Sequence, residues 1–262
     1  MYLNAIERAP VPFAGADSYL GDIPAIAGLG LLELHAPVTF LVGENGSGKS
    51  TLLEAVALAL GFNPEGGSKN FSFSTRDTHS GLHGCLTLHR GPYRPKDGFF
   101  LRAESFYNTA TEVEELSRRS LAPPEEFYRN YGGKSLHHQS HGESFLNLVH
   151  SRFHGQGIYL LDEPEAALSP ARQLTLLCEL HRLVEAGSQL LIATHSPILM
   201  AYPGAEILLL GEGPIRPVEY RETEHYQITK SFLDSPERML RILLRQDEEE
   251  LPCSGTRKPR KS

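Results

Sequence analysis

Eight consecutive residues, Gly43 to Ser50 (GENGSGKS), carry the clearest chemistry in the sequence. They fit the pattern GxxxxGK[ST], follow the uncharged apolar segment Val38 to Val42, and precede an apolar segment that reads as a helix over Thr51 to Leu60. A glycine-rich turn between a buried strand and a helix presents backbone N–H groups and the positive end of the helix dipole to an anion. The alternative, a glycine-rich turn that matches by accident, is disfavoured by this strand and helix context. The pattern therefore predicts a phosphate-binding loop.

Individual residues of this loop have separate expected roles. Lys49 is expected to reach the β- and γ-phosphates of a nucleotide, and Ser50 is expected to offer its hydroxyl to Mg²⁺. The complete predicted phosphate-binding set is Gly43, Asn45, Gly46, Ser47, Gly48, Lys49, Ser50 and Thr51.

Two carboxylates follow a second buried segment, Ile158 to Leu161. In an open α/β sheet, ligands bind at the carboxyl ends of the strands. Asp162 is therefore expected to complete the Mg²⁺ shell, and Glu163 to orient and deprotonate an attacking water. His195 follows a third buried segment (QLLIAT) and could bridge the γ-phosphate and Glu163. The structural alternatives, a cap for Asp162 and a surface charge for Glu163, are weakened by the neighbouring phosphate loop.

The elements that must position these residues alternate between strands and helices. This alternation predicts an α/β fold with a mainly parallel central sheet flanked by helices. The remaining predicted strands are 85–89, 98–103 and 207–210. The remaining predicted helices are 111–121, 123–130, 143–153, a helix from Pro170 to Gly187 with Leu174, Leu177, Leu180 and Val184 on one face, and an amphipathic helix beyond Ser235.

Length and composition bound the organisation of the chain. The 262 residues carry 25 basic and 32 acidic side chains, a net charge of −7. We expect one domain over 1–246 with an insertion, partly helical, at about 62–135, and a disordered tail over 247–262. The acidic balance counts against an extensive nucleic-acid surface. No segment reaches the roughly 18 apolar residues of a membrane span, and no signal peptide or CxxC pair occurs, so we expect a cytoplasmic protein without direct membrane insertion.

The ordered set of motifs resembles the ABC-type ATPases. The matching segments are the phosphate loop, SHGES at 140–144, the acidic strand end at 158–163 and the histidine at 194–195. The resemblance implies a P-loop fold with an antiparallel β part, ATP as substrate, Mg²⁺ as cofactor, and hydrolysis by a homodimer that encloses two ATP molecules. Ser140 and the Gly142 backbone would then contact the γ-phosphate bound to the other chain. SHGES keeps only the serine and one glycine of the usual LSGGQ, and no clear glutamine marks the Q-loop.

Two branches of this family compete. DEPE at 162–165, THSP at 194–197 and LLEA at 52–55 resemble the soluble SMC/RecF-like ATPases of DNA repair, chromosome handling and phage defence. The absence of heptads between the phosphate loop and SHGES makes the chain similar to compact "predicted ATPase" (AAA family ATPase) proteins without coiled-coil arms. DNA or an effector protein would be a possible partner. The alternative is the ATP-binding subunit of a membrane transporter, which would require a separate permease.

Overall fold

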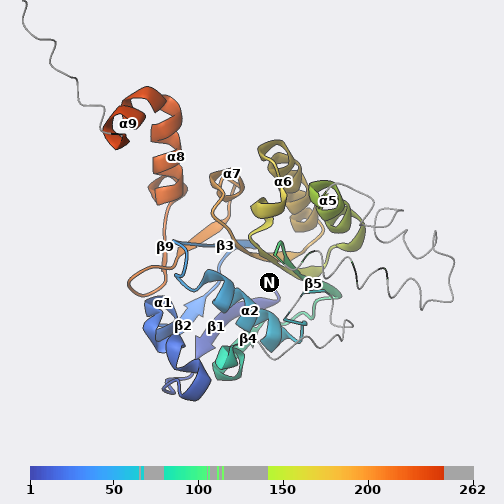
Figure 1. The fold of residues 1–262 in the computed structure, drawn as a ribbon. Coiled ribbons are helices and arrows are strands. Elements are labelled where there is room, and N and C mark those ends of the chain that lie inside the picture. The colour runs from blue at the N-terminus through green and yellow to red at the C-terminus, as the bar shows by residue number, and fades with distance from the viewer. Residues whose placement is uncertain are drawn as a thin grey trace, which may run out of the picture.

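The computed structural model describes residues 1–64, 66–67, 80–104, 106, 111, 114 and 141–244. In this part of the chain, helix α2 lies between a small antiparallel sheet and a larger mainly parallel sheet, and α5, α6 and α7 cover the opposite face of the larger sheet (Figure 1). The predicted helix over 123–130 and the tail over 247–262 lie outside the described residues, as does nearly all of the predicted helix over 111–121.

The larger sheet has the strand order β5-β6-β7-β3-β8-β9, and only β9 is antiparallel to its neighbour. Uncharged apolar runs form its inner strands because both faces of the sheet are covered. The parallel register places Arg102 beside Asp162 and Asp162 beside Ala193, so the carboxyl ends of three strands meet at one edge. The strands are β5 (Asp97–Arg102), β6 (Gly157–Asp162), β7 (Gln189–Ala193), β3 (Val38–Val42), β8 (Glu206–Leu209) and β9 (Arg216–Pro217).

The smaller sheet is antiparallel, with the order β2-β1-β4. Its strands are β1 (Leu3–Arg8), β2 (Leu31–Glu33) and β4 (Leu86–Arg90). Strands β4 and β5 both come from the stretch 62–135 that was expected to hold an insertion. Since each of them pairs with a strand of the nucleotide-binding fold, any inserted part is shorter than that stretch.

Helix α2 (Lys49–Leu60) begins directly after the glycine-rich loop, slightly earlier than the predicted Thr51. It ends as predicted at Gly61, whose φ of +90° is the left-handed conformation of a helix C-cap. Its apolar residues face both sheets, and Leu52, Leu53 and Val56 are completely buried. A helix covered on both sides buries apolar residues around most of its circumference.

The opposite face of the sheet is covered by α5 (His141–Arg152), α6 (Pro170–Glu185) and α7 (Pro197–Met200). The predicted face of α6 is confirmed in part: Leu180 is fully buried and Leu177 and Val184 pack partly buried against the core, but Leu174 is 56% exposed. The buried residues are Gln173, Leu176, Leu180 and Leu183. Gln173 can occupy the core because its amide donates to the Leu168 carbonyl and accepts a hydrogen bond from Ser196.

Two helices at the end of the described chain, α8 (Glu224–Asp234) and α9 (Pro236–Leu243), extend away from the body (Figure 1). The sequence predicted only the second of them. Neither helix contains a buried side chain, so no core pattern marked α8 in the sequence.

The short helices are η1 (Gly15–Asp22), α1 (Pro24–Ala27), η2 (Gly81–Cys85), η5 (Pro164–Ala167) and η6 (Tyr220–Glu222). A search of the described helices found no segment with the length and apolarity needed to cross a membrane.

Candidate functional site

The phosphate loop, Gly43 to Ser50, connects β3 to α2 and packs tightly against its surroundings. Gly48 has a φ of +95°, and a Cβ atom at this position would lie only 2.9 Å from Ile23 Cγ2 and 3.0 Å from Ile26 Cγ1. Gly43 also has a positive φ, and a Cβ atom there would collide with the carbonyl oxygen of Leu210. Glycine is therefore required at both positions by conformation and by space.

The Lys49 side chain is folded over this loop. Its Nζ donates hydrogen bonds to the carbonyl oxygens of Gly43 (2.9 Å) and Glu44 (2.8 Å), and the residue is only 4% exposed. Burial lowers the pKa of Lys49, while the nearby Glu163 and Asp162 carboxylates oppose that shift. The loop thus holds a desolvated ammonium group whose present partners are neutral carbonyls.

Ser50 joins the phosphate loop to the acidic strand end. Its Oγ donates a hydrogen bond to Asp162 Oδ1 at 2.8 Å. Burial raises the pKa of Asp162, and the Arg102 guanidinium and the Ser50 hydroxyl oppose this shift. A hydroxyl and a carboxylate oxygen, both hard ligands suited to Mg²⁺, are therefore adjacent at the carboxyl edge of the sheet.

Arg102 lies at the end of β5; the sequence offered it as a residue facing the nucleotide or a partner chain but did not fix its place. Its Nη1 donates to Glu54 Oε2 at 2.7 Å, and its Nε lies 3.4 Å from Asp162 Oδ2. The parallel pairing of β5 with β6 is what brings this guanidinium beside the acidic strand end.

Glu163 adopts the left-handed backbone conformation, with φ 48° and ψ 50°. This conformation is uncommon for a residue with a side chain and is often found at functional sites. The Glu163 N–H donates to the Ala193 carbonyl at 2.9 Å, and the side chain is 42% exposed. Its Oε1 lies 3.6 Å from His195 Nε2. Glu163 and His195 are thus neighbours, on the ends of adjacent strands.

Glu165 holds the segment that carries His195. Its carboxylate accepts hydrogen bonds from Thr194 Oγ1 (2.8 Å) and from the backbone N–H of His195 (2.5 Å). Burial raises the pKa of Glu165, and these hydrogen bonds oppose the shift. In the sequence, DEPE served only to distinguish family branches, and this role of Glu165 was not expected. The signal was present in the sequence, since DEPE and THSP follow strands that become neighbours in the sheet.

His195 also meets a second histidine that the sequence did not suggest. His195 Nδ1 lies 2.9 Å from Nε2 of His225, which belongs to the first turn of α8. Burial and the Lys49 charge lower the pKa of both imidazoles. No motif in the sequence pointed to His225, because α8 itself was not predicted.

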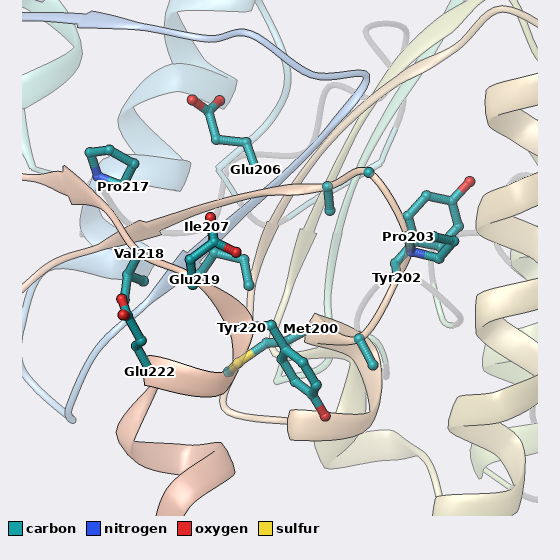
Figure 2. A pocket seen from close by; sticks show the side chains of 13 residues that line it. Met200, Tyr202, Pro203, Glu206, Ile207, Pro217, Val218, Glu219, Tyr220 and Glu222 are labelled. Carbon is teal, nitrogen blue, oxygen red and sulfur yellow. The ribbon is translucent and has the colours of Figure 1, made fainter.

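Cavities border both halves of this site. One, of about 390 Å³, is lined by the loop residues 43–47, by 209–212 and by Thr223 to His225. Another, of about 380 Å³, is lined by Ser50, Arg102, Asp162 and Glu163 among others. A larger pocket, of about 550 Å³, lies apart from these residues, between α7, β8, β9 and η6 (Figure 2).

Unpaired polar atoms gather at the same place. Within the described ranges, four buried side-chain atoms have no hydrogen-bond partner, and three of them belong to Ser47 (Oγ), Arg102 (Nε) and His195 (Nε2). Unsatisfied buried groups are uncommon in folded proteins and call for an explanation. A polar ligand bound between the loop and the acidic strand end would give all three atoms a hydrogen-bond partner. Among the described residues, no group of three His, Cys, Asp or Glu side chains is placed so that it could hold a metal ion.

The SHGES segment is described only in part. Ser140 lies outside the described residues, and α5 begins at His141 rather than at the predicted Glu143. A Cβ atom on Gly142 would lie 2.7 Å from the Ala167 carbonyl oxygen and 2.6 Å from Arg172 Nη1. Packing within one chain is therefore sufficient to require glycine at position 142.

Comparisons with known proteins found matches to both halves of the chain. One family model, described as "AAA domain", matches residues 29–114, and another, described as "AAA domain, putative AbiEii toxin, Type IV TA system", matches residues 135–201. The cobalt import ATP-binding protein CbiO of Salmonella paratyphi A is 28% identical over 213 residues, with 74% of each chain covered. The thiamine import ATP-binding protein ThiQ of Ruegeria sp. is 29% identical over 221 residues, covering 77% of this chain and 85% of the relative.

A solved structure shows the same fold. It is cbiO1 from Clostridium perfringens, described as part of the ABC transporter complex cbiONQ. The TM-score is 0.51 at 18% identity, with 92% of this chain and 99% of that chain covered. The phosphate loop, the acidic strand end and these matches point the same way, and the chain is similar to the P-loop ATPases of the ABC type.

Proposed function

We propose that the protein binds ATP with Mg²⁺ at the phosphate loop and hydrolyses it in a dimer of two chains. The observation that carries this proposal is the 2.8 Å hydrogen bond between Ser50 Oγ and Asp162 Oδ1, formed next to the buried Lys49. It joins the phosphate loop to the acidic strand end at the edge of the sheet where ligands of α/β proteins bind.

Phosphate binding would use the loop backbone and Lys49. The proposed contact residues are Gly43, Asn45, Gly46, Ser47, Gly48, Lys49, Ser50 and Thr51. Lys49 Nζ now donates to two loop carbonyls, and exchanging them for phosphate oxygens would give this desolvated cation a charged partner. The unpaired Ser47 Oγ is a further donor within the loop.

Ser50 and Asp162 would hold the magnesium ion. The donor set fits, because Mg²⁺ prefers hydroxyl, carboxylate, water and phosphate oxygens and is commonly held by only one or two protein carboxylates. When bound, the ion would neutralise charge on the β- and γ-phosphates. Arg102, 3.4 Å from Asp162 Oδ2, would keep this carboxylate ionised and oriented.

Glu163 and His195 are the proposed catalytic residues. The exposed Glu163 carboxylate would accept the proton of the attacking water, as a general base must. His195 Nε2 has no hydrogen-bond partner in the described chain and would contact the γ-phosphate. Glu165 would keep the His195 backbone in place.

A second chain would complete each site through Ser140 and Gly142. This part of the proposal rests on the resemblance of SHGES to the ABC signature.

We also propose that residues 1–246 form one domain, since strands from both halves of the chain contribute to the larger sheet.

Glu163→Gln tests the dimer and the general base together. This variant should bind ATP, lose hydrolysis and elute as a dimer in size-exclusion chromatography with light scattering. Glu237→Gln, on the exposed helix α9, is the matched control and should behave as the wild type. A Glu163→Gln protein that stays monomeric at high protein and ATP concentrations would contradict the dimer.

Lys49→Ala tests the phosphate loop. It should abolish ATP binding in calorimetry, whereas Lys230→Ala, which removes an exposed lysine paired with Asp234, should leave binding unchanged. Equal ATP affinity in Lys49→Ala and the wild type would overturn the site assignment.

We propose a cytoplasmic, SMC/RecF-like role for this ATPase. DEPE at 162–165, THSP at 194–197 and the two AAA-domain matches support it. A second candidate is the ATP-binding subunit of an importer, which the names of the CbiO and ThiQ relatives favour. A pull-down with Glu163→Gln in the presence of ATP separates the two. DNA-stimulated turnover with no permease in the eluate supports the first role, and co-purified permease subunits support the second.

A further inference from the structure

We infer that His225 is a positioning residue that fixes the orientation and the tautomer of His195, so that His195 presents its Nε2–H to the γ-phosphate of ATP. This inference rests on the proposed function. It adds to the site a residue from α8, the first of the two helices that extend away from the nucleotide-binding body (Figure 1).

The hydrogen bond between the two rings requires one donor and one acceptor. His195 Nδ1 and His225 Nε2 are 2.9 Å apart. On its other side, His195 Nε2 lies 3.6 Å from Glu163 Oε1. A carboxylate at that distance favours a proton on Nε2, and a neutral imidazole then has an acceptor at Nδ1. His225 must therefore donate from its own Nε2.

The electrostatic surroundings keep both rings neutral. Burial lowers the pKa of His195 and of His225, and the Lys49 ammonium lowers both further. Glu163 opposes the shift at His195, while Glu224 and Glu44 oppose it at His225. With one proton on each ring, the hydrogen bond between them couples the two tautomers, and Glu163 favours the pair in which His195 carries its proton on Nε2.

The position of His225 is fixed by the way α8 starts. Thr223 caps the helix, accepting from the Tyr226 N–H at 3.4 Å and donating to the Tyr220 carbonyl at 2.8 Å. Tyr220 in turn donates its hydroxyl to the Pro197 carbonyl at 2.9 Å. Figure 2 shows the Tyr220 ring lying between η6 and α7, beside Met200. Because Pro197 closely follows His195 in the chain, the two histidines lie on segments that are tied together.

His195 is consequently held at two points. Glu165 accepts a hydrogen bond from its backbone N–H, and His225 engages Nδ1 of its ring. The remaining ring atom, Nε2, is buried and has no hydrogen-bond partner among the described residues. Residues that orient metal-bound histidines contribute about 10- to 100-fold to affinity or activity, and by analogy we expect an effect near the lower end of this range for His225.

Three substitutions of His225 separate the effect of its N–H donor from the effect of its bulk. His225→Ala removes the donor, His225→Gln keeps an N–H donor, and His225→Glu offers an acceptor when ionised. We expect kcat to fall on the order of 10-fold in His225→Ala, with the ATP Kd changed less than about 2-fold. His225→Gln should recover most of the loss, and His225→Glu should be at least as slow as His225→Ala. His181→Ala, at the Tyr202 contact away from the site, is the control.

The tautomer of His195 can be measured without any enzyme activity. Long-range ¹H–¹⁵N spectra of protein labelled at histidine, assigned with His195→Gln, should show His195 protonated at Nε2 in the wild type. The same signals should change in His225→Ala and return in His225→Gln. Thermal melting curves confirm that each variant is folded.

Several outcomes would overturn the inference. They are an unchanged His195 tautomer in His225→Ala, no recovery of kcat in His225→Gln, or an ATP Kd that rises by the same factor as kcat falls. The last would mean that His225 contacts the nucleotide directly. A wild-type protein without ATPase activity would instead contradict the proposed function, and the spectra would still test the inference on His225.

Discussion

Each end of strand β5 contributes one residue to an ion pair. The two pairs are similar in composition, but the pKa values of their aspartates shift in opposite directions. At its carboxyl end, Arg102 faces Asp162, and at its amino end Asp97 faces Arg152. The side chains of both arginines are 19% exposed, and both aspartates are largely buried. Burial raises the pKa of Asp162. Burial also acts to raise the pKa of Asp97, but hydrogen bonds and the Arg152 charge more than offset it, and the net shift is downward.

The difference lies in how completely each carboxylate is hydrogen-bonded. Asp97 accepts from the Tyr159 hydroxyl (2.8 Å), from Arg152 Nη1 (3.0 Å) and from the His154 N–H (3.3 Å). Asp162 accepts from Ser50, while Arg102 Nε nearby forms no hydrogen bond. A buried ionised group with few hydrogen-bond partners destabilises the folded state. Such groups are typical of ligand-binding sites, where the ligand supplies the missing partners. We therefore expect the Asp97 cluster to serve stability and the Asp162 cluster to serve binding.

The largest expected effect is on activity, in Asp162→Asn. Losing the anionic oxygen should lower kcat/KM on the order of 100-fold, about 3 kcal/mol, because Mg²⁺ would lose a charged ligand. The free energy of unfolding should stay within about 1 kcal/mol of the wild type, since a costly buried charge is also removed. Steady-state phosphate release and urea unfolding measure the two quantities. A variant that lost stability but kept its activity would mean that Asp162 serves stability rather than binding.

Asp97→Ala should show the opposite profile. Removing this carboxylate leaves Arg152 and the Tyr159 hydroxyl without their partner, so the free energy of unfolding should fall by about 2 kcal/mol. Turnover per folded molecule should be unchanged, because Asp97 lies at the other end of the sheet. Urea unfolding monitored by circular dichroism gives the first quantity, and an ATPase assay normalised to folded protein gives the second.

The pH dependence of stability should distinguish the same two variants. Because the folded pKa of Asp97 lies below the unfolded value of about 3.9, its stabilisation is complete well above that value and is lost as pH falls through the folded pKa. The difference in unfolding free energy between the wild type and Asp97→Ala should therefore shrink as the pH falls from 7 to roughly 3. Because the pKa of Asp162 is raised, the ionisation of Asp162 lowers the free energy of unfolding as the pH rises. A difference that grew toward acid pH would refute this assignment.

The smallest expected effect is that of Tyr159→Phe. This change removes only the hydroxyl that donates to Asp97 and accepts from the Gly155 N–H at 3.1 Å. The ring stays stacked on Phe153, with centroids 4.4 Å apart, so the loss should be about 1 kcal/mol in unfolding free energy. Urea unfolding of this variant should give a value between the wild type and Asp97→Ala. No measurable loss would mean that the ring packing, rather than the hydroxyl, stabilises this end of the sheet, and a loss as large as that of Asp97→Ala would mean that the hydroxyl accounts for the whole contribution of Asp97.

Several parts of the molecule could be predicted from local patterns. The uncharged runs VTFLV, IYLL and QLLIA became buried strands, because apolar segments without charged residues are typical of strands covered on both faces. Gly61 marked the end of α2, since glycine adopts the left-handed cap conformation without cost. Long-range packing was harder to predict, as α6 shows. Its sequence contains two overlapping apolar stripes that share Leu180, and the tertiary structure buries the one with Leu176 and Leu183, where Gln173 bonds Leu168 and Ser196.

By itself, the sequence determined the phosphate loop, the acidic strand end and His195 as candidate chemistry, because their spacing and their places at strand ends are local properties of the chain. Only the tertiary structure decided that Ser50 bonds Asp162, that Arg102 and Glu165 belong to the site, and that His225 reaches His195. These contacts join residues that lie far apart in the sequence. Strand order, parallel register and the start of α8 bring them within hydrogen-bonding distance, and none of these leaves a periodic pattern in the residues themselves.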